Sequence, residues 1–193
     1  MPTINRITKM KRVLQHRQLD LTIVFENIHD PHNVSAILRT CDAVGIQNIN
    51  LLYTEEPFPK LGKKSSASAK KWIVTNKFKK ESELRKYLKS KNMTIYATYL
   101  NKESISIFDI DWTQPSAIIF GNEQRGVSEK CLDICDQIIS IPMFGVIESL
   151  NVSVAAAVVL YEATRQRLKK RYYPNQNLTD KWVEETLQRW MEK

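Results

Sequence analysis

Glycine is scarce in this chain of 193 residues, which contains only Gly45, Gly62, Gly121, Gly126 and Gly145. Their spacing forms neither the GxGxxG motif of dinucleotide-binding folds nor the GxxxxGK motif of phosphate-binding loops. Gly121 and Gly126 have the first spacing of the second motif, but no lysine follows them. Dehydrogenases and nucleoside triphosphate enzymes are therefore disfavoured.

Cysteines and long apolar runs are also few. The three cysteines include no CxxC pair, so the sequence predicts neither a disulfide framework nor a zinc site, and we expect no metal. No apolar run approaches the roughly 20 residues of a membrane-spanning helix, and the N-terminus lacks the apolar segment of a signal peptide. We therefore expect a cytoplasmic protein with no membrane partner.

Positive charge, in contrast, is in excess. The chain has 29 Lys and Arg against 21 Asp and Glu, which gives a formal net charge of +8. Such an excess favours a polyanionic partner, because Lys and Arg displace counterions from phosphates. The excess does not identify the polymer, and a basic protein that is merely soluble is the alternative.

Hydrophobic periodicity predicts an α/β protein. Strands are expected at 21–25, 49–53, 72–74, 94–98, 117–120 and 138–141. Helices are expected at 3–18, 30–45, 81–91, 128–135, 151–171 and 179–191. The succession of strand, helix and strand implies a parallel sheet with right-handed crossovers.

Three polar clusters stand at the ends of expected strands, where open parallel sheets bind ligands. They are His32-Asn33 through Arg39, the loop Gly121-Asn122-Glu123-Gln124-Arg125-Gly126, and Ile141-Pro142-Met143 through Ser149-Leu150-Asn151. Each also has a purely structural interpretation. Asn33 and Asn151 can cap helices, and Glu123 can be solvated in an ordinary turn.

Taken together, the three clusters resemble the three ordered motifs of the SpoU branch of the SPOUT methyltransferases. The matching residues are Asn33 with Arg39, Gly121-Asn122-Glu123-x-x-Gly126, and Ile141-Pro142-Met143 through Ser149-Leu150-Asn151-Val152-Ser153. The start of the chain, Arg12 and Arg17-Gln18-x-Asp20-Leu21, and the stretch Glu162-Ala163-x-Arg165-Gln166-Arg167 resemble the TrmH-type tRNA guanosine 2′-O-methyltransferases. The resemblance covers about residues 6–170.

The resemblance implies a Rossmann-like, parallel-sheet SPOUT fold with a deep trefoil knot at about 118–165, within a catalytic domain over 20–170. A basic, RNA-binding helix over 1–19 and a helical segment over 171–193 would extend this domain at both ends. The resemblance also implies a homodimer and the cofactor S-adenosylmethionine. The cofactor would be held, largely by backbone groups, at Thr98, Leu100, Gly121, Ile141, Met143 and Leu150.

The implied reaction is 2′-O-methylation of a ribose in tRNA, and the TrmH-like ends favour the D-loop guanosine at position 18. The implied catalytic residues are Arg39, Asn33, Glu123, Ser149 and Asn151. A guanidinium has no acceptor and stays protonated, so we expect Arg39 to stabilise the developing alkoxide or bind a phosphate rather than act as the base. A substrate phosphate, a water or His32 could take the proton.

RNA binding is expected from basic residues near both ends of the chain and from a Lys-rich stretch at 60–80, namely Arg6, Lys9, Arg12, Arg17, Lys63, Lys64, Arg165 and Arg167. If these residues bind phosphates, affinity falls with salt at a log–log slope of about −0.7 to −0.9 per phosphate contacted. Two alternatives stay open. One is 2′-O-methylation of another tRNA or rRNA ribose, and the other is a non-catalytic RNA-binding protein.

Overall fold

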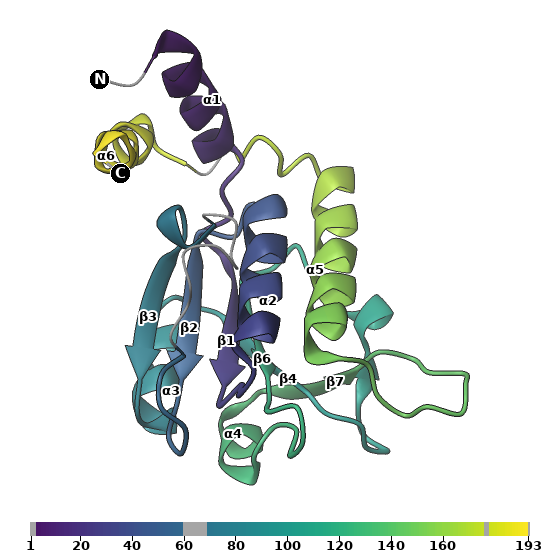
Figure 1. Cartoon of the computed structure of the whole chain (residues 1–193). Coiled ribbons are helices and arrows are strands. Elements are labelled where there is room, and N and C mark those ends of the chain that lie inside the picture. The colour runs from purple at the N-terminus through teal and green to yellow at the C-terminus, as the bar shows by residue number, and fades with distance from the viewer. Residues whose placement is uncertain (1–2, 60–68, 176–177, 193) are drawn as a thin grey trace.

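A single parallel sheet forms the centre of the molecule (Figure 1). The computed structural model describes residues 3–59, 69–175 and 178–192, and in these residues the strand order is β3-β2-β1-β6-β4-β7-β5. Every pairing between these strands is parallel, which confirms the predicted fold class. The strands are β1 (Leu21–Glu26), β2 (Asn48–Leu52), β3 (Val74–Phe78), β4 (Thr94–Thr98), β5 (Ile105–Ser106), β6 (Ser116–Phe120) and β7 (Gln137–Ser140).

Helices cover both faces of the sheet. The helices are α1 (Ile4–Gln15), α2 (Pro31–Ala43), α3 (Glu81–Lys89), α4 (Glu129–Ile134), α5 (Val152–Lys169) and α6 (Asp180–Met191), with 3-10 turns η1 (Ala69–Lys71) and η2 (Ile107–Asp109). In β1, Ile23 and Phe25 belong to the core that includes α2 and α5, whereas Val24 belongs to the core that includes α3 and α4. Because both faces are buried, the central strands read as continuous apolar runs.

Two helices begin at the carboxyl edge of the sheet, and side-chain caps fix where they start. Asp30 accepts a hydrogen bond from the backbone N–H of His32 at 2.8 Å, and Pro31 occupies the first turn of α2. Asn151 caps α5 by accepting from the backbone N–H of Ser153 at 2.8 Å. These caps place the beginnings of α2 and α5 beside the loops that leave the strands.

The terminal helices α1 and α6 pack against each other beyond the amino ends of the strands (Figure 1). Met10 and Leu14 of α1 form a small core with Leu187 and Trp190 of α6. The two terminal helices therefore form one small packed unit beside the sheet. None of the helices in the described part of the chain is both long and apolar enough to cross a membrane.

Two arginines predicted to bind RNA are instead parts of the core. Arg17 is 0% exposed, and its guanidinium binds Asp42 at 2.6 Å and the carbonyl of Ile46 at 3.0 Å. Arg167 is also 0% exposed and binds Asp20 at 2.6 Å. A buried guanidinium needs such partners, because an unpaired charge in the interior is costly. Neither guanidinium is open to an RNA phosphate, so the prediction is wrong for these two residues.

Candidate active site

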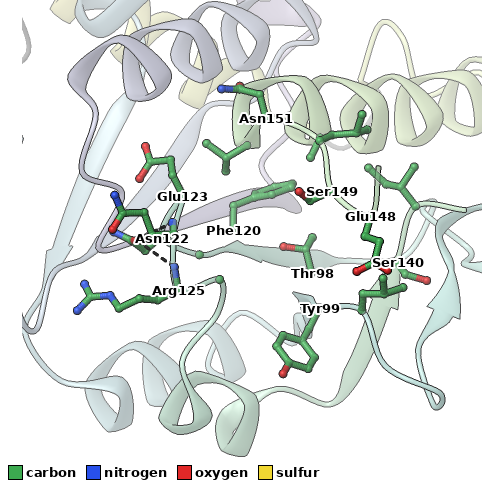
Figure 2. A pocket seen from close by; sticks show the side chains of 18 of the residues that line it. Thr98, Tyr99, Phe120, Asn122, Glu123, Arg125, Ser140, Glu148, Ser149 and Asn151 are labelled. Carbon is green, nitrogen blue, oxygen red and sulfur yellow. Dashed lines mark hydrogen bonds between the residues drawn. The ribbon is translucent and has the colours of Figure 1, made fainter. Parts of the chain in front are cut away.

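The loops that follow β4, β6 and β7 meet the start of α5 around one cavity of about 560 Å³ (Figure 2). This cavity lies at the carboxyl ends of parallel strands, the position at which open α/β sheets bind ligands. It is lined by all six residues predicted to hold the cofactor, Thr98, Leu100, Gly121, Ile141, Met143 and Leu150. Three of the predicted catalytic residues, Glu123, Ser149 and Asn151, line it as well.

The loop after β6 is shaped by its two glycines. A Cβ atom on Gly121 would lie 2.2 Å from the backbone carbon and oxygen of Gly126, so no other residue fits there without moving the loop. Gly126 has a φ of +69°, a conformation that side chains disfavour. Asn122 closes the turn by accepting from the backbone N–H of Gln124 at 2.9 Å and of Arg125 at 3.3 Å. The loop consequently forms a tight turn, and all its residues from Gly121 to Gly126 line the cavity.

Glu123 is held by three hydrogen bonds from the segment that starts α2. Its carboxylate accepts from the backbone N–H groups of His29 at 3.0 Å and Asp30 at 3.2 Å, and from Nδ2 of Asn33 at 2.8 Å. Burial alone would raise the pKa of Glu123, but the hydrogen bonds from Asn33, His29 and Asp30 outweigh it and lower that pKa below its ordinary value. Glu123 is therefore an ionised acceptor and a weak base.

Asn33 connects the other two clusters. While its Nδ2 donates to Glu123, its Oδ1 accepts from Nδ2 of Asn151 at 3.1 Å. The Oδ1 of Asn151 in turn accepts from the hydroxyl of Ser153 at 2.6 Å. The structural interpretation of Asn151 as a helix cap is thus correct, and the same side chain also belongs to a polar chain that links all three motifs.

Arg39 stands apart from this arrangement. It lies on the exposed side of α2 and does not line the cavity. Within the described residues its guanidinium has no hydrogen bond or ion pair. His32 is also exposed, at the first turn of the same helix. The structure therefore connects Asn33 to the cavity through its hydrogen bonds with Glu123 and Asn151. It leaves Arg39 exposed, where another molecule can bind it.

The predicted RNA-binding residues other than the buried Arg17 and Arg167 fall into three groups. Arg6, Lys9 and Arg12 are exposed along α1. Arg165 is exposed on α5, where Glu162 holds its guanidinium through two contacts of 2.8 Å. Lys63 and Lys64 lie outside the described residues.

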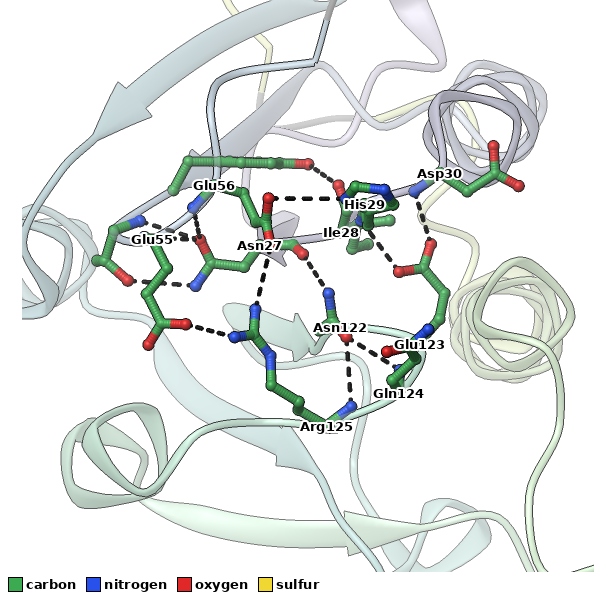
Figure 3. A network of polar contacts seen from close by, with 12 residues as sticks. Asn27, Ile28, His29, Asp30, Glu55, Glu56, Asn122, Glu123, Gln124 and Arg125 are labelled. Carbon is green, nitrogen blue, oxygen red and sulfur yellow. Dashed lines mark hydrogen bonds and ion pairs between the residues drawn. The ribbon is translucent and has the colours of Figure 1, made fainter.

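Asn27 is a site residue that sequence reasoning missed (Figure 3). It follows β1 with a φ of 47°, and its Oδ1 accepts from the backbone N–H groups of Thr54, Glu55 and Glu56 at 3.0, 3.2 and 3.3 Å. Its carbonyl accepts from Nδ2 of Asn122 at 2.8 Å. Asn27 thereby anchors the cavity loop to the loop after β2. An Asn directly after a buried strand is the available signal, since Asn tolerates this conformation better than most residues.

Further cavity residues were also not predicted. Tyr99 and Glu148 line the cavity, as does Arg125, whose guanidinium contacts Glu55 at 2.5 Å and Glu56 at 3.4 Å (Figure 3). These contacts hold the cavity loop from its outer side. Across the described ranges, no group of three or more His, Cys, Asp or Glu side chains is arranged to hold a metal ion.

Known proteins are similar to this chain in both sequence and structure. Residues 20–161 match the model of the SpoU rRNA Methylase family. A tRNA (guanosine(18)-2′-O)-methyltransferase of Thermus thermophilus is 42% identical over 188 residues, which cover 97% of this chain and 96% of the relative.

Two solved structures extend the comparison. The TrmH/SpoU tRNA-modifying enzyme of A. aeolicus superposes with a TM-score of 0.91 at 36% identity, covering 97% of this chain and 95% of that one. The SpoU methyltransferase AviRb of Streptomyces viridochromogenes, in complex with AdoMet, superposes with a TM-score of 0.69 at 26% identity. That match covers 87% of this chain and 63% of the other.

Proposed function

This chain belongs to the SpoU methylase family, and we propose that it transfers a methyl group from S-adenosylmethionine to the 2′-hydroxyl of guanosine 18 in the D-loop of tRNA. It has the SPOUT fold of that family, and we include in the proposal a trefoil knot at about 118–165. A cytoplasmic location is also part of the proposal, and the tRNA-modifying relatives support it. The observation that carries the proposal is the chain of contacts from Glu123 through Asn33 to Asn151, beside a cavity of about 560 Å³.

The cavity fits the cofactor in size and in the groups that line it. Its volume of about 560 Å³ lies within the range of about 300–1,000 Å³ that is common for small-molecule pockets. Glycine at position 121 lets the loop that lines the cavity close tightly. When bound, S-adenosylmethionine supplies an electrophilic methyl group on a sulfonium. The chain then has to align a ribose hydroxyl with that group and manage its proton.

The geometry assigns positioning roles to the hydrogen-bonded side chains of Glu123, Asn33 and Asn151. Three of the roughly four acceptor positions of the Glu123 carboxylate are taken by Asn33 and by two backbone N–H groups. These hydrogen bonds lower the pKa of Glu123, so this carboxylate is a weak base, and its role is to orient Asn33. Ser149 and Asn151 face the cavity and can contact the ribose. Arg39 lies outside the cavity, on the exposed side of α2. It therefore acts on an RNA that binds along this side of the helix, either directly or while held by a second subunit.

A homodimer is part of the proposal, and exposed apolar side chains support it. Val154, Tyr161 and Leu168 of α5 are 47%, 56% and 57% exposed, and their spacing of seven residues places them on one side of the helix. Phe144 and Val146, in the loop before α5, are 98% and 100% exposed. A cluster of this kind marks an interaction surface, whereas single exposed apolar residues do not.

Methyl transfer from labelled S-adenosylmethionine tests the proposed function. The protein is incubated with separate pools of tRNA and rRNA, and the methylated ribose is mapped. We expect label in tRNA, at the 2′-oxygen of guanosine 18. Label in rRNA alone would establish the ribosomal alternative, and RNA binding without label would establish a non-catalytic binding protein.

A further inference from the structure

A second cavity, of about 460 Å³, lies at the opposite edge of the sheet from the first. It opens at the amino ends of β1, β2 and β3, on the face of the sheet that α3 and α4 cover. Trp182 and Arg189 of α6, a helix that lies beyond the amino ends of the strands (Figure 1), also line it. Its floor is formed by Thr22, Gln47 and Asn50. None of its lining residues belongs to the active-site cavity.

The floor is polar where a parallel sheet is normally apolar. Thr22 and Asn50 are 2% and 0% exposed. Asn50 donates to the hydroxyl of Thr22 at 3.0 Å, and Asn76 donates to both Asn50 and the hydroxyl of Tyr87 at 3.1 Å. Burying such groups is unfavourable unless they are hydrogen-bonded, as these are. The floor is therefore a prearranged polar surface.

Gln47 breaks this pattern of satisfied groups. Its side chain lines the cavity and is 3% exposed, and its Oε1 is buried with no hydrogen-bond partner. Its Nε2 also has no hydrogen bond to any residue in the described ranges. Gln47 lines a neighbouring hollow of about 360 Å³ too, together with Val74 and Arg189. Rotation of the terminal amide exchanges donor and acceptor, so either can be offered to a ligand in these spaces.

The walls and rim of the second cavity suit a nucleotide. Tyr87 and Trp182 provide aromatic surfaces of the kind on which unpaired bases stack. Lys91 and Arg189 are exposed cations at the rim, and none of the described residues that line this cavity is acidic. Phosphate is the ligand group that such a rim favours.

We infer that this second cavity binds one nucleotide, with its base against Tyr87 and Trp182, its polar edge toward Gln47 and its phosphate near Lys91 and Arg189. The nucleotide is either a free nucleoside monophosphate or one unpaired residue of a bound RNA. The RNA form rests on the proposed function, whereas the free form does not.

Titration with AMP, GMP, CMP and UMP, and separately with a tRNA transcript, tests this inference on the full chain. Side-chain amide signals of Gln47 and Asn50 and the indole signal of Trp182, followed by NMR, report where a monophosphate binds. In Gln47→Leu we expect about tenfold weaker binding, the equivalent of one lost hydrogen bond in a buried site. The Tm should stay equal or rise, because the buried Oε1 has no partner to lose.

Two further variants complete the experiment. Gln188→Leu makes the same change on the exposed side of α6, outside the cavity, and should leave binding unaltered. Lys91→Gln alters only an exposed rim residue, so it tests the phosphate contact without endangering the fold.

The outcomes separate the two sources of the nucleotide. Monophosphate binding with signal changes at Gln47, Asn50 and Trp182 supports the free form. Weaker tRNA binding in Gln47→Leu and Lys91→Gln, with kcat kept at saturating tRNA, supports the RNA form. If no monophosphate binds and both variants bind tRNA as the wild type does, the inference is overturned. A wild type that transfers no methyl group would contradict the proposed function instead, and these binding measurements would still stand.

Discussion

The Asn33 carboxamide uses both of its ends, since it donates to Glu123 and accepts from Asn151. A carboxylate at this position could accept from Asn151 but could not donate to Glu123. The hydrogen bond from Asn33 helps to lower the pKa of Glu123 against the effect of burial. Replacing this donor with a second negative charge must therefore raise that pKa.

Asn33→Asp should consequently show an altered pH profile of methyl transfer. At pH 7 to 8 the two carboxylates repel each other, and we expect kcat to fall by about tenfold or more, as when a buried charged contact is broken. As the pH falls below neutrality, one proton shared by the pair restores a donor, and part of the activity should return. Asn33→Ala is the control, because it should lose activity without recovery at low pH. A profile of Asn33→Asp that runs parallel to the wild type would contradict the role of this contact.

Arg39→Ala should remove nearly all turnover and leave cofactor binding intact, because Arg39 does not line the cavity. We expect kcat to fall by about 10²- to 10³-fold, the usual effect of removing a group that stabilises developing charge. Calorimetry with S-adenosylmethionine should give a Kd within about twofold of the wild type, a difference of less than about 0.5 kcal/mol. Arg39→Lys keeps the charge without the planar fork and should recover only part of the activity. Loss of cofactor affinity in Arg39→Ala would disprove this assignment.

The sequence identified the reactive residue types better than it identified their partners. Asn33, Glu123 and Asn151 were predicted as members of separate clusters, and their contacts appear only in the folded chain. Arg17 and Arg167 were misread as surface charges, since a sequence does not show which cations find buried partners. Their partners lie 25 and 147 residues away.

At the scale of elements, the loop after β6 depends on the close approach of Gly121 to Gly126. In Gly121→Ala the new Cβ would lie 2.2 Å from backbone atoms, so the loop has to move. We expect a loss of about 1–3 kcal/mol in the free energy of unfolding, the usual effect of inserting a methyl group into packed structure. Cofactor affinity should fall with it. Calorimetry and denaturant titration measure the two effects.

Gly145→Ala is the matched control for this prediction. A Cβ atom at Gly145 meets nothing within 4 Å, so the same substitution should leave both quantities unchanged. Equal cofactor affinity in Gly121→Ala and Gly145→Ala would show that the loop after β6 does not shape the binding site.

Elements with strong apolar runs were predicted to within one or two residues. The expected strand at 94–98 is β4 as observed, and the expected strand at 117–120 is one residue shorter than β6. The prediction of a strand at 72–74 is wrong, because β3 starts only at Val74. The ring of Trp72 instead packs against the ring of Trp190 in α6, with 4.9 Å between the ring centroids. None of the five residues of β3 is fully buried, so this strand shows no apolar run in the sequence. β5, with two residues, is too short to give any pattern.

The arrangement of the whole molecule depends on contacts between distant parts of the chain. A parallel sheet was predicted, but the placing of β6 between β1 and β4 was not, since local patterns do not specify which strands pair. The packing of α1 against α6 is likewise a contact between the two ends of the chain. The trefoil knot, expected at about 118–165, stays a prediction that came from the family resemblance alone.

The exposed apolar side of α5 leads to a prediction about assembly. If Val154, Tyr161 and Leu168 are covered by a second copy, Tyr161→Glu puts a carboxylate into an apolar interface. An uncompensated buried charge costs about 3 kcal/mol or more, so the dissociation constant of the dimer should rise at least about a hundredfold. Sedimentation equilibrium over a range of concentrations should find a dimeric wild type and a folded, monomeric Tyr161→Glu. Ile4→Glu, at a side chain 82% exposed on α1, should sediment as the wild type does. A monomeric wild type, or an unchanged Tyr161→Glu, would remove the dimer from the proposal, and with it the possibility that Arg39 acts on substrate held by a partner subunit.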